Sequence, residues 1–262
     1  MTCGPVIELK DIVFKRRGET LIDKLNWLVL PGQHWALIGP NGAGKTLLLR
    51  LVTGYLWPSD GEITILGHKL GEIDLRLLRK SIGWVSQALA DLMPQNLPLN
   101  EVVLSGPKAS LGLYEAAPKK DLERAQALLG QFGLINMQNR AFGLLSSGER
   151  QRALLVRAVM AKASLLILDE PMSNLDLGGR ELFIKLVTSL ASGPNSPTVV
   201  LTTHNISELG PFITHAAIIK KGRLVKAGLL EETITTKWLS QAFDLPLCVE
   251  KTPNGRYLAY LK

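Results

Sequence analysis

Residues 39–46 combine glycines with a lysine and a threonine at a spacing suited to holding a polyphosphate. In order they are Gly39, Pro40, Asn41, Gly42, Ala43, Gly44, Lys45 and Thr46, which fill the pattern G-x-x-x-x-G-K-[ST] completely. Glycines in such a loop let the backbone curl until successive N–H groups point inward at an anion. Lys45 would reach the β- and γ-phosphates, and the Thr46 hydroxyl would hold Mg²⁺. These residues predict a binding site for a polyphosphate and its Mg²⁺ ion.

The segments on either side of this loop are the ones that such a site requires. Residues 34–38 predict a short buried strand before it, and residues 47–52 predict a buried helix after it. A helix that opens at Lys45 adds the positive end of its dipole to the anion site. The alternative is a glycine-rich turn that matches the pattern by chance. Such a turn would need neither a buried strand before it nor a buried helix after it.

A pair of acidic residues follows a second buried strand, the apolar run at 165–168. Asp169 ends that strand, where a carboxylate can hold Mg²⁺ through water. Glu170 is placed to accept a proton from an attacking water, a role worth roughly 10²- to 10⁴-fold in rate. The alternative is that both are solvated turn residues before Pro171. Spacing alone does not decide which carboxylate holds the metal and which is the base.

Ser146 and Glu149 have the spacing of a capping box, which predicts a helix over residues 150–160. A capped helix start is sufficient to explain Glu149. The Ser146 hydroxyl and the Gly148 N–H could also bind an anion at that helix end.

Several motifs in fixed order resemble those of the ATP-binding cassette (ABC) ATPases, over about residues 6–228. Residues 145–152 look like the signature, 165–170 like the Walker B strand and 173–176 like the D-loop. Gln87 stands at the position of the Q-loop and His204 at that of the switch histidine. Read alone, Gln87 is a solvated loop residue and His204 an ordinary buried histidine.

The resemblance implies a role for each of these positions and implies ATP and Mg²⁺ as ligands. Glu170 would be the catalytic base, and Asp169 would hold Mg²⁺ together with Thr46 and Gln87. His204 would donate a hydrogen bond to the γ-phosphate. Ser146 and Gly148 would bind the γ-phosphate of ATP on a second subunit, so that the site is complete only in a head-to-tail dimer.

Four positions depart from the family pattern. Arg16 stands where an aromatic residue usually stacks on adenine, and a guanidinium plane can also stack on a base. Ser147 replaces a signature glycine, Glu149 replaces its glutamine, and Met172 replaces a frequent threonine. The catalytic set is complete, and we expect an active ATPase.

Composition narrows the classes of partner. The net charge is +7 and the pI is near 9.4, but lysine and arginine are scattered without a long basic run, so nucleic-acid binding is not expected. Cys3 and Cys248 form neither a disulfide framework nor a metal site, which suits a reducing cytosol. No apolar run approaches the ~20 residues that span a bilayer, and the start lacks a secretory pattern. We therefore expect a cytoplasmic protein, peripheral on the cytoplasmic face of the cell membrane.

Alternating strand and helix patterns place these motifs on an α/β fold. We expect a P-loop NTPase with a largely parallel core sheet, an N-terminal antiparallel β subdomain and an inserted α-helical subdomain at about 88–160. The ATPase domain would span 1–232. An appendix at 233–262 would hold a helix around 237–243 and a hairpin of strands 247–251 and 257–261 about the turn Asn254-Gly255.

The predicted function is that of an ATP-hydrolysing subunit that powers transport of a solute through a separate integral membrane permease. It would act with a second ATPase subunit, most simply as a homodimer. The alternative is a soluble ABC ATPase without a transport role, such as the type that serves iron–sulfur cluster assembly.

Overall fold

The computed structural model of the chain describes residues 4–193 and 196–262. It divides into two compact units, Met1–Leu75 with Val187–Lys262, and Arg76–Leu186. The boundaries fall within helices α2 (Leu75–Lys80) and α7 (Leu177–Ala191). Each unit is described below by itself.

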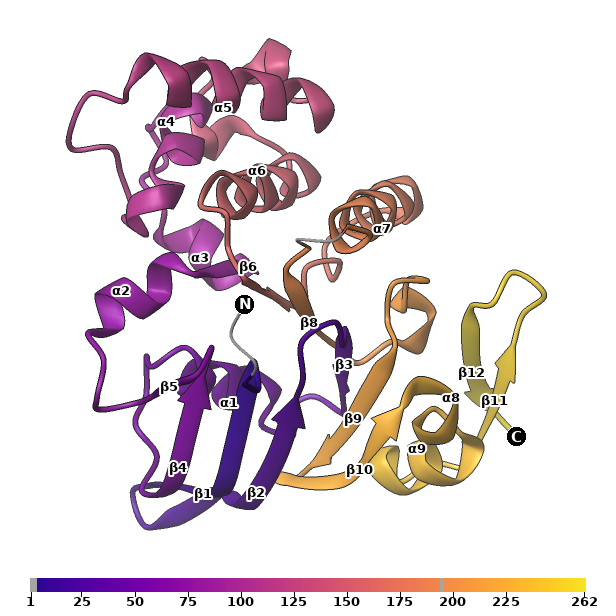
Figure 1. Cartoon of the computed structure of the whole chain (residues 1–262). Coiled ribbons are helices and arrows are strands. Elements are labelled where there is room, and N and C mark those ends of the chain that lie inside the picture. The colour runs from indigo at the N-terminus through magenta and orange to yellow at the C-terminus, as the bar shows by residue number, and fades with distance from the viewer. Residues whose placement is uncertain (1–3, 194–195) are drawn as a thin grey trace. The chain divides into compact units, whose positions relative to one another are not determined.

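The first unit begins with an antiparallel sheet in the order β2-β1-β4-β5 (Figure 1). Its strands alternate apolar and polar residues, so that one face is buried and the other is exposed. Trp27 of β2, for example, lies opposite the buried Leu9 of β1 and is itself buried. The strands are β1 (Ile7–Arg16), β2 (Glu19–Val29), β4 (Asp60–Ile65) and β5 (His68–Lys69).

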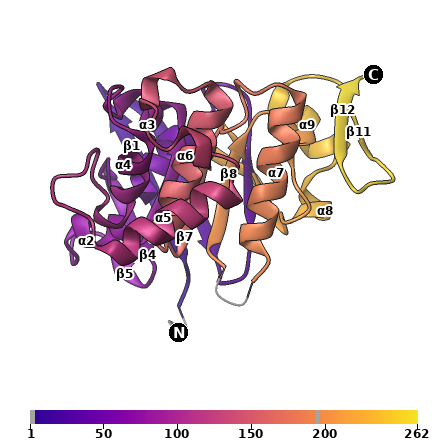
Figure 2. The same ribbon diagram turned by 90° about the horizontal axis from the view of Figure 1, so that it is seen from above.

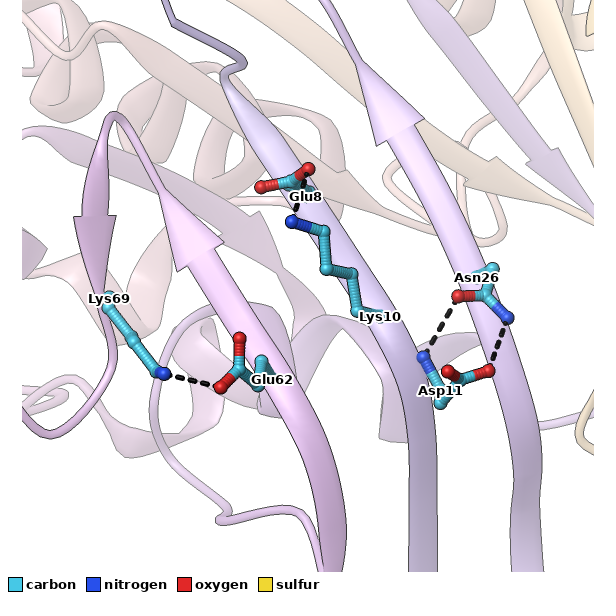
Figure 3. A network of polar contacts seen from close by, with 6 residues as sticks. All are labelled: Glu8, Lys10, Asp11, Asn26, Glu62 and Lys69. Carbon is cyan, nitrogen blue, oxygen red and sulfur yellow. Dashed lines mark hydrogen bonds and ion pairs between the residues drawn. The ribbon is translucent and has the colours of Figure 1, made fainter.

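Polar side chains bridge the exposed face of this sheet (Figure 3). The Asn26 amide donates to Asp11 Oδ1 while the Asp11 N–H donates to Asn26 Oδ1, both at 2.9 Å, where the β1–β2 register shifts. Lys10 pairs with Glu8 at 3.0 Å, and Lys69 of β5 pairs with Glu62 of β4. The two Asp11–Asn26 bonds hold the local register at the bulge, where ladder hydrogen bonds are disrupted.

The same unit holds parallel strands whose residues are almost all buried, as continuous apolar runs predict. β3 pairs in parallel with both β8 and β9, and β10 pairs antiparallel with β9. Helix α1 follows β3 through the loop of residues 39–44. The elements are β3 (Trp35–Ile38), α1 (Lys45–Val52), β8 (Thr198–Thr203), η4 (Ile206–Glu208), β9 (His215–Lys220) and β10 (Arg223–Leu229).

The end of the chain belongs to the same unit and forms two helices and a hairpin that pack against the rest of it (Figure 1). The hairpin register runs from Leu247 opposite Leu261 to Lys251 opposite Tyr257. Helix α9 is capped by Thr235, whose hydroxyl accepts the Trp238 N–H. The elements are α8 (Leu230–Thr233), α9 (Thr236–Phe243), β11 (Leu247–Lys251) and β12 (Tyr257–Leu261).

The second unit pairs two parallel strands and is otherwise helical. Helix α6 packs against β6, α4 and α5, and Figure 2 shows α5 alongside α6. Its elements are β6 (Ile82–Ser86), α3 (Gln87–Leu92), α4 (Leu99–Leu104), η1 (Gly106–Lys108), α5 (Lys119–Gln131), η2 (Ile135–Met137), η3 (Phe142–Leu144), α6 (Ser147–Met160) and β7 (Leu165–Asp169).

The structure confirms the expected fold class: parallel strands, an antiparallel β subdomain at the start and a helical segment between. The sequence pattern also predicts a helix over 181–190, a loop over 191–197, and Leu122 on the buried face of a helix at 121–132. The first and the last of these differ from the structure. α7 begins at Leu177 rather than near Glu181, and Leu122, expected on the buried face of its helix, is 41% exposed. The loop expected at 191–197 includes residues 194–195, which lie outside the described residues.

Candidate active site

The phosphate-binding pattern forms a loop between β3 and α1. Gly42 and Gly44 have φ values of +77° and +106°, a region that glycine adopts without strain. Gly44 is the N-cap of α1, and no side chain caps this helix start. The first backbone N–H groups of α1 are therefore directed at the loop, together with the positive end of the helix dipole. This arrangement suits an anion.

Lys45 folds back over this loop. Its Nζ donates to the carbonyl oxygens of Gly39 at 2.9 Å and Pro40 at 3.2 Å, and the residue is only 5% exposed. Its ammonium group therefore lies over the concave side of the loop, where a phosphate would need a positive charge. The adjacent Thr46 is the second residue of α1.

His204 emerges beside the loop because of strand register. Ile38, the last residue of β3, pairs in parallel with Thr203, the last residue of β8. Gly39 and His204 are therefore the next residues along two neighbouring strands, at their carboxyl ends, where ligands bind in open α/β sheets. His204 is exposed, which argues against the alternative of an ordinary buried histidine.

Arg16 lines a cavity next to the loop. The cavity has a volume of about 390 Å³ and adjoins Thr46, the last residue of the phosphate-binding pattern. Phe14 and Arg16 come from the end of β1, and the other side is formed by α1 and the segment after it. The lining residues are Phe14, Arg16, Thr46, Leu47, Arg50 and Leu56. Apolar side chains and guanidinium planes can both stack on a nucleotide base.

The acidic pair lies in the second unit, at the end of β7. β6 and β7 run parallel, and their last residues, Ser86 and Asp169, are paired. Gln87 and Glu170 are therefore the next residues after neighbouring strand ends, which brings three of the expected site residues to one edge. Asp169 is 8% exposed, so its carboxylate is largely withdrawn from bulk water.

Glu170 has a left-handed backbone conformation, with φ at +46°. A residue with a side chain pays a steric penalty there, and such strain clusters at functional sites. Ser173 holds the turn, since its N–H and its hydroxyl both donate to the Glu170 carbonyl oxygen, at 3.3 and 3.0 Å. The turn sets the direction in which the Glu170 side chain leaves the strand end.

Gln87 begins α3, which is capped by Ser86. Its amide nitrogen donates to Asp91 Oδ1 at 2.8 Å, one turn further along that helix. The amide nitrogen is thus occupied within the helix, while its side-chain oxygen remains able to act as a ligand.

The signature segment forms the capping box that the sequence predicts. The Ser146 N–H donates to Glu149 Oε2 at 2.7 Å, and the Glu149 N–H donates to Ser146 Oγ at 3.3 Å. Ser147 adds a contact that the sequence did not indicate, since its hydroxyl donates to the Asn174 carbonyl oxygen at 2.9 Å. The start of α6 is thereby tied to residues 173–176, and Ser146 stays exposed.

No group of three or more His, Cys, Asp or Glu side chains in residues 4–193 and 196–262 is placed to hold a metal ion. No helix in these ranges is long and apolar enough to cross a membrane.

The expected site residues thus form two groups. The phosphate loop, His204 and Arg16 lie in the first unit; Gln87, Asp169, Glu170, Ser146 and Gly148 lie in the second. Sequence reasoning missed Arg50 and Leu56 as cavity-lining residues. The position of Arg50 on α1, one turn after Thr46, was the available signal for it.

Comparison with known proteins agrees with this geometry. The family model described as ABC transporter matches residues 22–173. The chain is 39% identical to the uncharacterised ABC transporter ATP-binding protein YlmA of Bacillus subtilis (strain 168), over 93% of each chain.

Solved structures give the same result. The fold superposes with a TM-score of 0.79 and 25% identity on an inward-facing ABC transporter assigned to the metal-chelate type, over 99% of each chain. It also superposes, with a TM-score of 0.74 and 25% identity, on a dimeric post-hydrolysis state of the ATP-binding cassette MJ0796 bound to ADP and phosphate, covering 86% of this chain and 98% of that one. The chain belongs to the ABC transporter family, as one of its nucleotide-binding ATPase cassettes.

Proposed function

We propose that this cassette hydrolyses ATP with Mg²⁺ and that the cycle powers transport of a solute through a separate membrane permease. Two cassettes, most simply two copies of this chain, would close head to tail around ATP and reopen after hydrolysis. The observation that carries the proposal is the capped start of α6, where Ser146 is exposed. The resemblance to an ABC transporter ATP-binding protein over nearly the whole chain supports it.

Each group of residues has a distinct task in this reaction. The backbone N–H groups of residues 39–46 and the ammonium of Lys45 would neutralise the β- and γ-phosphates, the main requirement for phosphoryl transfer. Thr46, Asp169 and Gln87 would supply the protein's oxygen ligands to Mg²⁺, which lowers the charge on the phosphates.

Glu170 would accept the proton of the attacking water, and His204 would hold the γ-phosphate by a hydrogen bond. The left-handed backbone at Glu170 supports this assignment, since a steric penalty of that kind is retained where a fixed side-chain direction is needed.

The exposed Ser146 of the signature supports the dimer. The capping box uses the Ser146 oxygen and the Glu149 N–H within the helix, while Ser146 remains exposed and residues 147–149 are half-buried. A helix start of this kind favours an anion. We propose that the anion is the γ-phosphate on the second cassette. Its arrival would complete the charge stabilisation, in the way that an arginine finger does in other nucleotidases.

The proposed place of action is the cytoplasmic face of the cell membrane, where the cassette would dock on its permease. Two arguments support it: the relatives are named as ATP-binding proteins of ABC transporters, and no described helix can span a membrane.

A capture experiment with the Glu170→Gln variant tests the proposal. This variant should keep ATP bound in a closed dimer, because binding does not need the base. We would recover it with ATP from cells solubilised in mild detergent and identify the proteins that accompany it, with Lys45→Ala as the control that cannot hold ATP. A polytopic membrane protein that depends on ATP and on Lys45 supports transport. Soluble partners alone would support the soluble, non-transport class instead.

A further inference from the structure

The turn between β9 and β10 contacts the phosphate loop. This turn comprises Lys221 and Gly222, directly after Lys220, the last residue of β9. The Gly222 N–H donates to the carbonyl oxygen of Ala43 at 2.9 Å. Ala43 lies between the two loop glycines that have positive φ, so this bond fixes the part of the loop whose N–H groups face the phosphates.

Ile219, near the end of β9, lies against the same loop. A Cβ added at Gly39 would lie 2.2 Å from the Ile219 carbonyl oxygen, so β9 touches the start of the loop. A Cβ added at Gly44 would lie 3.6 Å from Ile219 Cδ1 and 3.7 Å from Gly222 Cα. The loop is therefore held at both of its ends and at its middle by residues 219–222.

Gly222 itself has almost no room to move. Its φ is +73°, and a Cβ at this position would lie 2.0 Å from the Leu21 carbonyl oxygen of β2. Its own carbonyl oxygen accepts the Asp23 N–H at 3.1 Å. Only glycine fits this close approach of backbone to backbone. Figure 1 shows the β9–β10 hairpin reaching β2.

Both sides of the turn are anchored. Arg223 Nε donates to Asp23 Oδ2 at 2.9 Å, which ties the turn to β2. Lys220 Nζ donates to the Gln241 carbonyl oxygen at 2.7 Å and to Asp244 Oδ1 at 2.5 Å, which ties it to the end of α9. The turn thus has a fixed position from which its N–H group can hold the loop.

We infer that Gly222 is a positioning residue for nucleotide binding. It touches no phosphate, but it holds the Ala43 peptide, and thereby the N–H groups of the loop, in the arrangement that receives the β- and γ-phosphates. Because a hydrogen bond of this kind contributes roughly a two- to tenfold factor to an equilibrium constant, its loss should be measurable in nucleotide affinity. The inference rests on the function proposed for residues 39–46.

The first test compares two glycine-to-alanine variants with the same backbone strain. Gly255 in the β11–β12 turn has φ +77°, close to that of Gly222, but a Cβ there meets no atom within 4 Å. We expect Gly222→Ala to raise the Kd for MgATP about tenfold and to raise KM with kcat at saturating ATP little changed. Gly255→Ala should leave Kd within twofold of the unsubstituted protein while carrying the same strain.

A second variant removes only the donor. Incorporating glycolic acid at position 222 by cell-free translation replaces the N–H with an ester oxygen and adds no side chain. We expect a Kd for MgATP two- to tenfold higher. This variant decides the question if Gly222→Ala does not fold.

Three outcomes would overturn the inference. They are a folded Gly222→Ala protein with unchanged Kd, an equal rise in Kd for Gly255→Ala, and an ester variant with unchanged Kd. Failure of the unsubstituted protein to bind MgATP would overturn the proposed function and, with it, this inference.

Discussion

Replacing Glu149 by glutamine should have opposite effects on folding and on ATP-dependent dimerisation. Glu149 Oε2 accepts the Ser146 N–H at 2.7 Å, a bond that a glutamine oxygen can also accept. What the substitution removes is the negative charge in the first turn of α6. A carboxylate at a helix start is worth about 0.3–1 kcal/mol. For a chain of this size that corresponds to a fall in Tm of roughly 1–4 °C.

The same charge opposes the γ-phosphate that we propose to bind at this helix start. Residues of one helical turn lie within about 6 Å of one another, given a pitch of about 5.4 Å. Like charges at about 6 Å repel by roughly 3 kcal/mol at an effective dielectric constant of about 20. Because Glu149 is half-buried and screened by solvent, we expect about half of this. A head-to-tail homodimer contains two such sites, so the gain counts twice and the dimer constant should improve about a hundredfold.

Sedimentation velocity with MgATP measures the dimer constant, in the Glu170→Gln background so that hydrolysis does not disperse the dimer. Glu101→Gln is the matched control, because Glu101 also lies in the first turn of a helix, α4. It should change Tm similarly and leave the dimer constant unchanged. A weaker or unchanged dimer with Glu149→Gln would refute the placement of the γ-phosphate at this helix.

Three further predictions concern pH, the D-loop and the base cavity. Burial lowers the pKa of His34 from its ordinary value of 6.5, and its Nδ1 accepts the Val199 N–H at 3.2 Å. As pH falls, the unfolded chain therefore takes up the proton before the folded one does. Tm should fall as pH drops below about 6.5 and stay level above it. His34→Gln should flatten this dependence of Tm on pH, which thermal melts at several pH values measure. Ser147→Ala removes the bond to the Asn174 carbonyl oxygen and should lower kcat two- to tenfold with ATP affinity retained, whereas a lower affinity with unchanged kcat would contradict a role at the D-loop. Arg16→Ala should raise the Kd for MgATP about threefold to thirtyfold through lost stacking on the base, measured by isothermal titration, and an unchanged Kd would exclude Arg16 from the base site.

Local sequence signals predicted the elements that local chemistry determines. The strands 247–251 and 257–261 match the expected residues because Asn254-Gly255 fixes the turn and the alternation fixes the register. The capping box was predicted for the same reason, since the side chains of Ser146 and Glu149 each accept the other's backbone N–H.

Other features depend on contacts that no local pattern contains. α7 begins earlier than expected because Asp176 Oδ1 accepts the Gly179 N–H at 2.7 Å, which caps a helix start containing two glycines of low helix propensity. Leu122 lies outside the buried stripe of α5 because the width of that stripe depends on the neighbouring helices. The support of Ala43 by Gly222 joins residues 179 positions apart and left no trace in either segment's pattern.

Some features of the site residues could be inferred from local patterns and others could not. The identity and order of Lys45, Asp169, Glu170 and His204 could be inferred from motifs, and parallel register explains why pairs of them emerge at neighbouring strand ends. The left-handed backbone of Glu170 could not be inferred, because it depends on how the following turn packs. The bond from Gln87 to Asp91 could not be inferred because it needs the helix α3, whereas Gln87 read alone is a loop residue.

The polar pairs on the antiparallel sheet also bear on how this protein stays dispersed. β5, which ends the order β2-β1-β4-β5, has only two residues, and its Lys69 is paired with Glu62. Short, charged sheet edges resist the strand addition that leads to aggregates. The cassette gains from such an edge while it is a single subunit, before it meets its partners. In the crowded cell a long, uncharged edge strand would otherwise pair with the sheet edge of another copy.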